Sequence, residues 1–189
     1  MLVNVISLEE RADRRINIEK EAKEQGFEIK YWPGIKDPLN RVFVGIAQAH
    51  KQIVRWAAME RLPEVCIMED DCYFFAPGAW KYYLSQKPED FDIYFGGILW
   101  GDYVEENVVR DLCAMSMYII HERFYPTFLD LTELNHIDRS LAGKGKYVVC
   151  DPMVVSQREG YSDNKLRHDS YERYLVGKRL FGQEGLKNG

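Results

Sequence analysis

The sequence predicts an α/β sandwich whose central sheet is mainly parallel. Short β-branched runs alternate along the chain with longer segments in which apolar residues recur at helical spacing. Two such pairs are a run at 2–8 before a charged segment at 10–25, and a helical segment at 42–61 before the apolar run 65–68. The chain has 189 residues, which is the usual length of one domain. We therefore expect a single domain over 1–189 with a mixed-charge tail from about 165.

Each expected element has a local reason. Ser7 followed by Glu10 resembles a capping box that opens a helix, and Gly26 closes that helix. Alternation of apolar and polar residues predicts a strand over 27–32, and apolar residues at helical spacing predict the helix over 42–61. The later predicted elements are a helix at 79–86, a strand at 91–97, a strand at 113–120, a helix at 121–131, a short helix at 138–143, a strand at 147–150 continued by 152–157, and a polar loop at 160–164.

Composition narrows the class of protein. The formal net charge of −5 argues against a general nucleic-acid-binding protein, which is usually basic. No apolar run approaches the roughly 20 residues that span a bilayer, and the N-terminus does not resemble a signal peptide. The four cysteines form no C-x-x-C pair, so a zinc site is not expected. We expect a cytoplasmic protein, with peripheral contact at the inner face of the membrane left open.

Three consecutive carboxylates end the apolar run 65–68. Glu69, Asp70 and Asp71 would repel one another unless a cation lies between them, and carboxylate oxygens suit Mn²⁺ and Mg²⁺. If the strand continued through them, Glu69 and Asp71 would point to one side and Asp70 to the other. The alternative is a solvated acidic turn. A signalling receiver domain also carries acids after a strand, but after its first strand, whereas here they follow the third.

Other candidate residues also follow predicted strands. Arg11, Arg14 and Arg15 lie near a helix start, where cations are unfavourable unless an anionic partner is present; a solvated charged face is the alternative. Gly96 and Gly97 end a strand, which permits close approach of a ligand or merely a turn. Because ligands bind at the carboxyl ends of strands in such sheets, these segments and the acids are expected to meet in one cleft. His50, within the helix 42–61, is interpreted as structural.

Taken in order, these motifs resemble glycosyltransferase family 25, which includes bacterial lipooligosaccharide galactosyltransferases and collagen galactosyltransferases. The similar stretches are Val5-Ile6-Ser7-Leu8 with Arg11 and Asp13-Arg14-Arg15, Gly45 to His50 with Trp56, Glu64 to Asp71, 113–120 with Tyr118, His136-Ile137-Asp138, and Asp151-Pro152 with Gln157, Ser162 and Asp163. The resemblance covers nearly the whole chain. The Glu-Asp-Asp end and the spacing from Pro152 through Gln157 to Asp163 are its most specific parts.

The resemblance implies a GT-A, Rossmann-like fold and an inverting transfer of a hexose, galactose or glucose, from a nucleotide sugar such as a UDP-sugar to a glycan or other hydroxyl acceptor, as in lipopolysaccharide biosynthesis. It also implies a Mn²⁺ or Mg²⁺ cofactor. The expected donor-binding residues are Ser7, Leu8, Arg11, Arg14, Arg15, Glu69, Asp70, Gly96, Gly97 and Gln157; the expected metal ligands are Asp71, Glu69, Asp163 and His168; the expected general base is Asp138, with Asp102 second.

The chain also departs from the family pattern. The cysteine and serine that precede the histidine in the family are Ile46 and Ala49 here, and Phe43 replaces an acid usual shortly before Gly45. The chain is short for the family. These departures leave open a catalytically inactive sugar-nucleotide-binding module, or a glycosyltransferase that acts on protein or nucleic acid.

Overall fold

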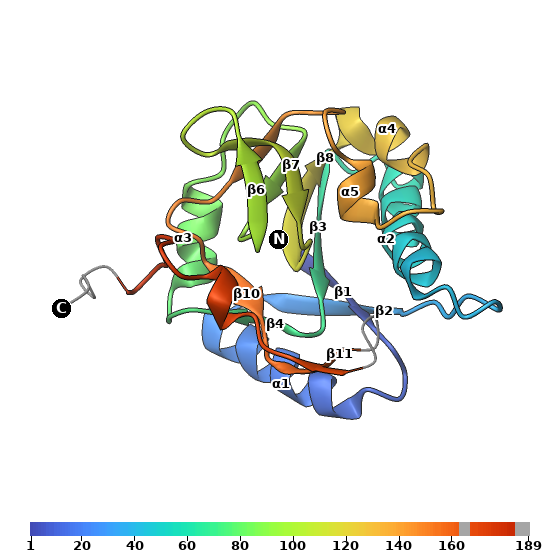
Figure 1. Ribbon diagram of the computed structural model, residues 1–189, viewed down its shortest axis with the longest axis horizontal. Helices are drawn as coiled ribbons and strands as arrows, with labels where there is room; N and C mark the ends of the chain where they lie inside the picture. Colours follow the sequence, from blue (N-terminus) through green and yellow to red (C-terminus); the bar gives the residue numbers. More distant parts are fainter. Residues whose placement is uncertain (163–166, 184–189) are drawn as a thin grey trace.

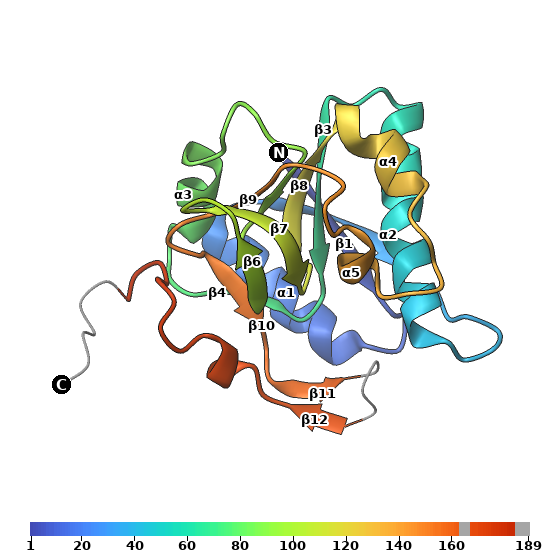
Figure 2. The ribbon, with the colours of Figure 1, turned by 45° about the horizontal axis from the view of Figure 1, so that its top comes forward.

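The computed structural model describes residues 1–162 and 167–183, and these residues form a sheet with helices on both faces (Figures 1 and 2). The eight strands of the sheet lie in the order β2-β1-β3-β8-β5-β9-β7-β6. Their bounds are β1 Leu2–Ser7, β2 Glu28–Pro33, β3 Glu64–Glu69, β5 Ile93–Phe95, β6 Trp100–Tyr103, β7 Val108–Cys113, β8 Met117–His121 and β9 Tyr147–Val149. The predicted α/β sandwich is confirmed.

The sheet is mixed. Strands β2, β1 and β3 are mutually parallel, as are β5 and β9, whereas β8 is antiparallel to both β3 and β5, and β7 is antiparallel to β9 and β6. Two reversed strands, β8 and β7, therefore lie between strands that share one direction, and the arrangement is GT-A-like. The register pairs Ile6 with Glu69, so the carboxyl ends of β1 and β3 lie next to each other. The segments that follow these two strands therefore meet at one edge of the sheet.

Two apolar cores fill the spaces between the sheet and its helices. On one face α2 (Val42–Met59), α4 (Tyr125–Leu129) and α5 (Ile137–Ser140) cover the sheet; on the other lie α1 (Ala12–Gln25) and α3 (Ala79–Ser85). Alternate residues of β3 supply the two cores. Ile67 packs in the same core as Ile53 of α2, and Met68 in the same core as Ile18 of α1. Burial on both faces explains why β3 reads as a continuous apolar run.

Two smaller sheets flank the carboxyl edge of β3. Strand β4 (Cys72–Phe74) pairs antiparallel with β10 (Val155–Gln157), and β11 (Gly160–Ser162) pairs antiparallel with β12 (Arg167–Asp169). The register of the first sheet places Gln157 opposite Cys72, directly beside the acidic turn. Two 3₁₀ helices, Glu122–Phe124 and Glu172–Tyr174, complete the described elements.

Several predicted elements were wrong in detail. The hairpin of β6 and β7 was missed, because β7 includes Arg110 and Asp111 and the hairpin lies at a sheet edge, where Trp100, Tyr103 and Arg110 are exposed. The predicted helix at 121–131 is a 3₁₀ turn followed by the short α4, with Pro126 near its start. Residues 152–157 do not continue β9; within them Val155–Gln157 form β10 against β4, and part of the predicted loop at 160–164 is β11.

Asp37 fastens the loop between β2 and α2. Its Oδ2 accepts hydrogen bonds from the backbone N–H groups of Leu39 and Arg41, and the Arg41 guanidinium pairs with both carboxylate oxygens. The hydrogen bond from Arg41 lowers the pKa of Asp37 to about 2. A lowered pKa means that the ionised carboxylate stabilises the folded state above the ordinary aspartate pKa. That stabilisation is lost as the pH falls from about 4 toward 2.

We expect Asp37→Ala to lower the melting temperature by a few degrees at pH 7, because the loop loses these hydrogen bonds. Thermal unfolding followed by circular dichroism should show the difference from wild type shrinking as the pH approaches 2.5. Asp130→Ala is the matched control, because Asp130 is an exposed acid at the end of α4. A difference that stays constant from pH 7 to pH 2.5 would contradict the assigned role.

Among the helices of the described residues, none combines the length and the apolar character that crossing a bilayer requires.

Candidate active site

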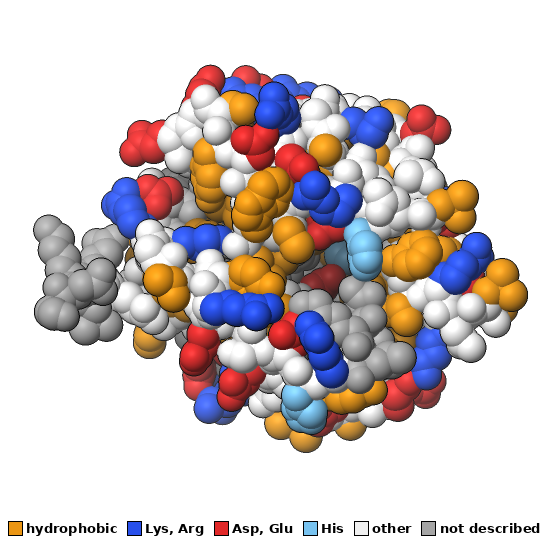
Figure 3. Space-filling model, in the orientation of Figure 1, with side chains coloured by type: hydrophobic (Ala, Val, Ile, Leu, Met, Phe, Trp, Pro, Cys, Tyr) orange, Lys and Arg blue, Asp and Glu red, His pale blue; other side chains and the backbone are white. Residues whose placement is uncertain are grey.

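The acidic triplet lies in a turn at the carboxyl edge of the sheet. Strand β3 ends at Glu69, and Asp70 and Asp71 form the turn that leads into β4. The predicted alternation, with Asp70 on the opposite side from Asp71, is wrong because the strand ends before these two residues. Both instead reach the same guanidinium group, that of Arg14. Figure 3 shows acidic side chains at the bottom of a hollow near the middle of one face of the molecule.

Arg14 supplies positive charge to this turn. Its Nη1 lies 2.9 Å from Asp70 Oδ1 and 3.2 Å from Asp71 Oδ2, and its Nη2 donates to the carbonyl of Tyr161 on β11 at 2.9 Å. The contact follows from topology, because α1 begins directly after β1 and β1 pairs with β3. The protein therefore provides part of the cationic charge that the sequence indicated was needed.

The turn nevertheless remains electrostatically unsatisfied. Burial, followed by the negative charge of Glu69, raises the pKa of Asp71 to about 7 in spite of Arg14. Burial also raises the pKa of Asp70, which Arg14 partly offsets. Among the described residues, nothing donates a hydrogen bond to the buried Oδ1 of Asp71. An acceptor oxygen in this position is costly unless a ligand binds it.

Glu69 is held at both of its carboxylate oxygens. His50 of α2 lies with Nε2 3.4 Å from Oε1, and Gln157 donates from Nε2 to Oε2 at 3.2 Å. His50 is fully buried, and its Nδ1 is 2.8 Å from the hydroxyl of Tyr118. The sequence interpretation of His50 as structural missed this contact. Its one available signal was the position of His50 in the family-like helix motif.

Arg11, Arg14 and Arg15 of the predicted arginine segment have different partners. Arg15 donates from Nε to Ser7 Oγ at 3.1 Å, at the carboxyl end of β1, whereas Arg11 pairs with Asp13 at 3.0 Å. The predicted capping box is wrong, because α1 begins at Ala12 without a side-chain cap and the Ser7 hydroxyl accepts from Arg15. The carbonyl of Leu8 accepts instead from the N–H of Arg11. The arginine segment therefore lies beside the acidic turn, and Arg14 contacts Asp70 and Asp71.

Close packing accounts for the double glycine after β5. Gly96 and Gly97 are buried, and a Cβ on Gly97 would lie 2.2 Å from the carbonyl oxygen of Val155. A Cβ on Gly96 would lie 2.4 Å from the methyl group of Met117. The missing side chains therefore let β10 lie against the end of β5.

The two candidate bases lie in different settings. Asp138, in α5, accepts from the N–H of Ala114 at 3.1 Å, and the carbonyl of Ser116 accepts from the N–H of Glu69 at 2.9 Å. The short connection from β7 to β8 therefore links Asp138 to the acidic turn. Ala114 has a φ of 81°, a left-handed conformation that is costly for a residue with a side chain. Asp102 instead pairs with Arg110 across the β6–β7 hairpin at the sheet edge.

The expected metal ligands are only partly brought together. Asp163 lies outside the described residues, and His168 is an exposed residue of β12 whose ring lies 5.8 Å from that of Tyr161. Within residues 1–162 and 167–183, no group of three or more His, Cys, Asp or Glu side chains is placed to hold a metal ion. Mg²⁺ and similar cations, however, are commonly bound by one or two carboxylates together with substrate phosphates. Asp71, with its unpartnered oxygen, and Glu69 fit that pattern.

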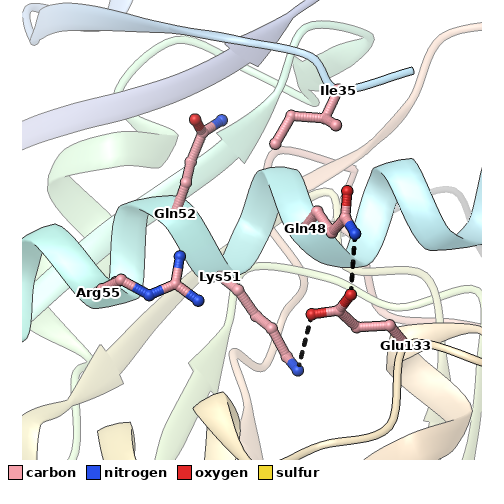
Figure 4. Close-up of a pocket in the computed structure, with 6 residues that line it drawn as sticks. All are labelled: Ile35, Gln48, Lys51, Gln52, Arg55 and Glu133. Carbon is pink, nitrogen blue, oxygen red and sulfur yellow. Dashed lines mark hydrogen bonds and ion pairs between the residues drawn. The ribbon is translucent and has the colours of Figure 1, made fainter. Parts of the chain in front are cut away.

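Two hollows elsewhere on the molecule are not lined by Glu69, Asp70 or Asp71. One of about 300 Å³ lies along α2 (Figure 4), where Gln48 and Lys51 hold the carboxylate of Glu133 at 3.0 and 3.2 Å. Another of about 320 Å³ lies at the end of β9, where Lys178 donates to the carbonyls of Ile98 and Leu99. The acidic turn is the candidate active site, because perturbed carboxylates converge there with an arginine.

Comparison with known proteins supports the fold. No family model and no curated protein matches the sequence. Among solved structures, the chain is similar to A197 from STIV with a TM-score of 0.57 and 10% sequence identity, over 88% of this chain and 91% of A197. The two share a fold. At this identity the likeness shows the fold alone.

Two further solved structures are similar with lower scores. A glycosyltransferase involved in the glycosylation of the major capsid of PBCV-1 matches with a TM-score of 0.49 and 13% identity, over 80% of this chain and 81% of that one. HddC from Yersinia pseudotuberculosis matches with a TM-score of 0.47 and 13% identity, over 79% of this chain and 68% of HddC.

Proposed function

We propose that this protein is an inverting glycosyltransferase related to family 25. It transfers a hexose, galactose or glucose, from a nucleotide sugar such as a UDP-sugar to a hydroxyl group of a glycan or other acceptor, with Mn²⁺ or Mg²⁺ as cofactor. The observation that carries the proposal is Asp71, a partly buried carboxylate whose Oδ1 is buried and unpartnered, beside Glu69 and Arg14. It lies where strands β1 and β3 of a GT-A-like sheet end, which is where such folds bind ligands.

The donor side of the site follows from charge. As the bond from sugar to nucleotide breaks, negative charge grows on the nucleoside diphosphate. Asp71 and Glu69 would hold the divalent cation, which would supply Lewis-acid neutralisation of that charge. Arg14 and Arg15 lie at the start of α1, and guanidinium groups suit the phosphate oxygens that they would bind. His50 and Gln157 hold Glu69 in one orientation.

We assign the role of general base, on the acceptor side of the site, to Asp138. An inverting transfer needs a base that takes the proton from the acceptor hydroxyl. Asp138 is tied through Ala114 to the loop that touches Glu69, whereas Asp102 is paired with Arg110 on the hairpin. Trp100 of β6 is 47% exposed, with the guanidinium of Arg139, the neighbour of Asp138, 5.2 Å from its ring. An exposed indole of this kind suits the apolar face of a sugar.

A sugar-nucleotide-binding module without catalysis is the second candidate. It is favoured by Arg14, which already pairs with Asp70 and Asp71, and by Ile46 and Ala49, which depart from the family pattern. Formation of a glycosylated product separates the two functions, since both bind the donor.

The test is a thermal-shift panel of UDP-galactose, UDP-glucose, UDP-N-acetylglucosamine and GDP-mannose, each with and without Mn²⁺. A ligand at a hundredfold excess over its dissociation constant stabilises by about 2.7 kcal/mol, so one donor is expected to raise the melting temperature by about 5 to 10 °C, and only with Mn²⁺. The selected donor is then assayed for transfer. If no nucleotide sugar shifts the transition with or without the cation, the proposed function is wrong.

A further inference from the structure

Arg14 makes more contacts with the acidic turn than a solvated surface arginine would. One nitrogen, Nη1, reaches both Asp70 and Asp71, and the other, Nη2, is bound to the carbonyl of Tyr161. The side chains of Arg14 and Asp71 are only 17% and 16% exposed, and that of Asp70 only 7%. Contact with Asp71 and Asp70 raises the pKa of Arg14 although burial opposes that shift. The guanidinium is therefore a fixed positive charge inside the site.

The position of this charge conflicts with a bound divalent cation. Arg14 Nη1 lies 3.2 Å from Asp71 Oδ2, and a Mg²⁺ ion sits about 2.0 to 2.1 Å from each oxygen that binds it. Two positive centres on one carboxylate in a partly buried site repel strongly, because water screens them poorly there. An ion at the unpartnered Oδ1 and the guanidinium at Oδ2 would share one carboxylate, so each would weaken the contact of the other with Asp71.

We infer that Arg14 is a built-in counter-ion that competes with the divalent cation for Asp71 and is handed over to the donor phosphates when the cation binds. This inference rests on the proposed function. While no cation is bound, Arg14 limits the repulsion among Glu69, Asp70 and Asp71. When the cation takes Asp71, the released guanidinium gains the phosphate oxygens as new partners. The protein alone therefore binds the cation weakly, and the nucleotide and the cation bind with positive cooperativity.

Calorimetric titration of the purified protein with MnCl₂ alone tests the competition directly. Arg14→Gln is expected to bind Mn²⁺ about tenfold more tightly than wild type, because the cation no longer has to displace a positive charge. Arg15→Gln is the matched control. It removes the same charge from the same helix turn, but Arg15 contacts Ser7 and lies over the ring of Tyr31. It should stay within about twofold of wild type.

A second titration, with UDP in the presence of saturating Mn²⁺, tests the handover. Arg14→Gln is expected to bind UDP about tenfold more weakly than wild type, so the same substitution moves the two affinities in opposite directions. Arg14→Lys keeps a charge and should bind Mn²⁺ nearly as weakly as wild type. A merely structural role for Arg14 would weaken both ligands together. Circular dichroism of each variant checks that it is folded.

The outcomes separate the inference from the proposed function. Mn²⁺ affinity in Arg14→Gln that is equal to or weaker than wild type overturns the inference, even if the wild-type protein transfers a sugar. Tighter Mn²⁺ binding in Arg14→Gln, without binding of any nucleotide, supports the competition but overturns both the handover and the proposed function. No Mn²⁺ binding by any variant, either alone or in the presence of UDP, overturns both.

Discussion

Asp71→Asn is expected to abolish cation-dependent sugar transfer while the protein stays folded and gains stability. The amide keeps the shape of the side chain but removes the charge that would bind the cation, so kcat/KM should fall by about 10³-fold or more. The folded state disfavours the ionised Asp71, as its raised pKa of about 7 shows. The free energy of unfolding at pH 8 should therefore rise by about 1 to 2 kcal/mol.

Three measurements check this prediction: transfer with the selected donor in buffered Mn²⁺, calorimetric titration with Mn²⁺, and urea unfolding. Asp130→Asn makes the same chemical change in an exposed aspartate and should leave all three unchanged. An Asp71→Asn protein that keeps full activity would remove the basis of the proposed function. An Asp71→Asn protein that is less stable than wild type would show that the carboxylate serves the fold.

The acidic turn could be predicted from sequence because its causes are local. A continuous apolar run of the length of one strand, ended by Glu69, Asp70 and Asp71, has few other interpretations. The topology rule for ligand sites also predicted correctly that the segment after the first strand would come to these acids, as the contact of Arg14 with Asp70 shows. The rule could not predict which arginine would contact the acids. That depends on where α1 begins and on Asp13, which forms an ion pair with Arg11.

The parts that sequence reasoning missed depend on partners far away in the chain. The contact of His50 with Glu69 requires α2 to pack on the sheet at one particular rotation about its axis. The residues near His50 in the sequence do not indicate that rotation. Gly96 and Gly97 were predicted to permit close approach of a ligand or merely a turn, and the close neighbour that the structure shows is β10, some 60 residues later in the chain. The reversed strand β8 was likewise not foreseen, since a buried apolar strand looks the same in either direction.

Asp138→Asn is expected to reduce turnover by about 10²-fold or more while the affinity for the donor stays within about twofold of wild type. An amide cannot take the proton of an acceptor hydroxyl. Its oxygen can still accept the hydrogen bond from the N–H of Ala114, so the connection from β7 to β8 should keep its place. The measurements are steady-state transfer kinetics and calorimetric titration with UDP in the presence of Mn²⁺.

Asp138→Ala separates the base from the anchor of this loop. It loses the proton acceptor and also the hydrogen bond that holds Ala114 at a φ of 81°, so it should match Asp138→Asn in activity but be less stable by about 1 kcal/mol. If Asp138→Asn is active and only Asp138→Ala is not, Asp138 serves the reaction by holding the loop, and the proton acceptor lies elsewhere. Asp102→Asn then becomes the informative variant, because a loss of turnover there would move the base to the hairpin. If donor binding collapses in Asp138→Asn, the carboxylate belongs to the donor side, because the loop it anchors also touches Glu69 through Ser116.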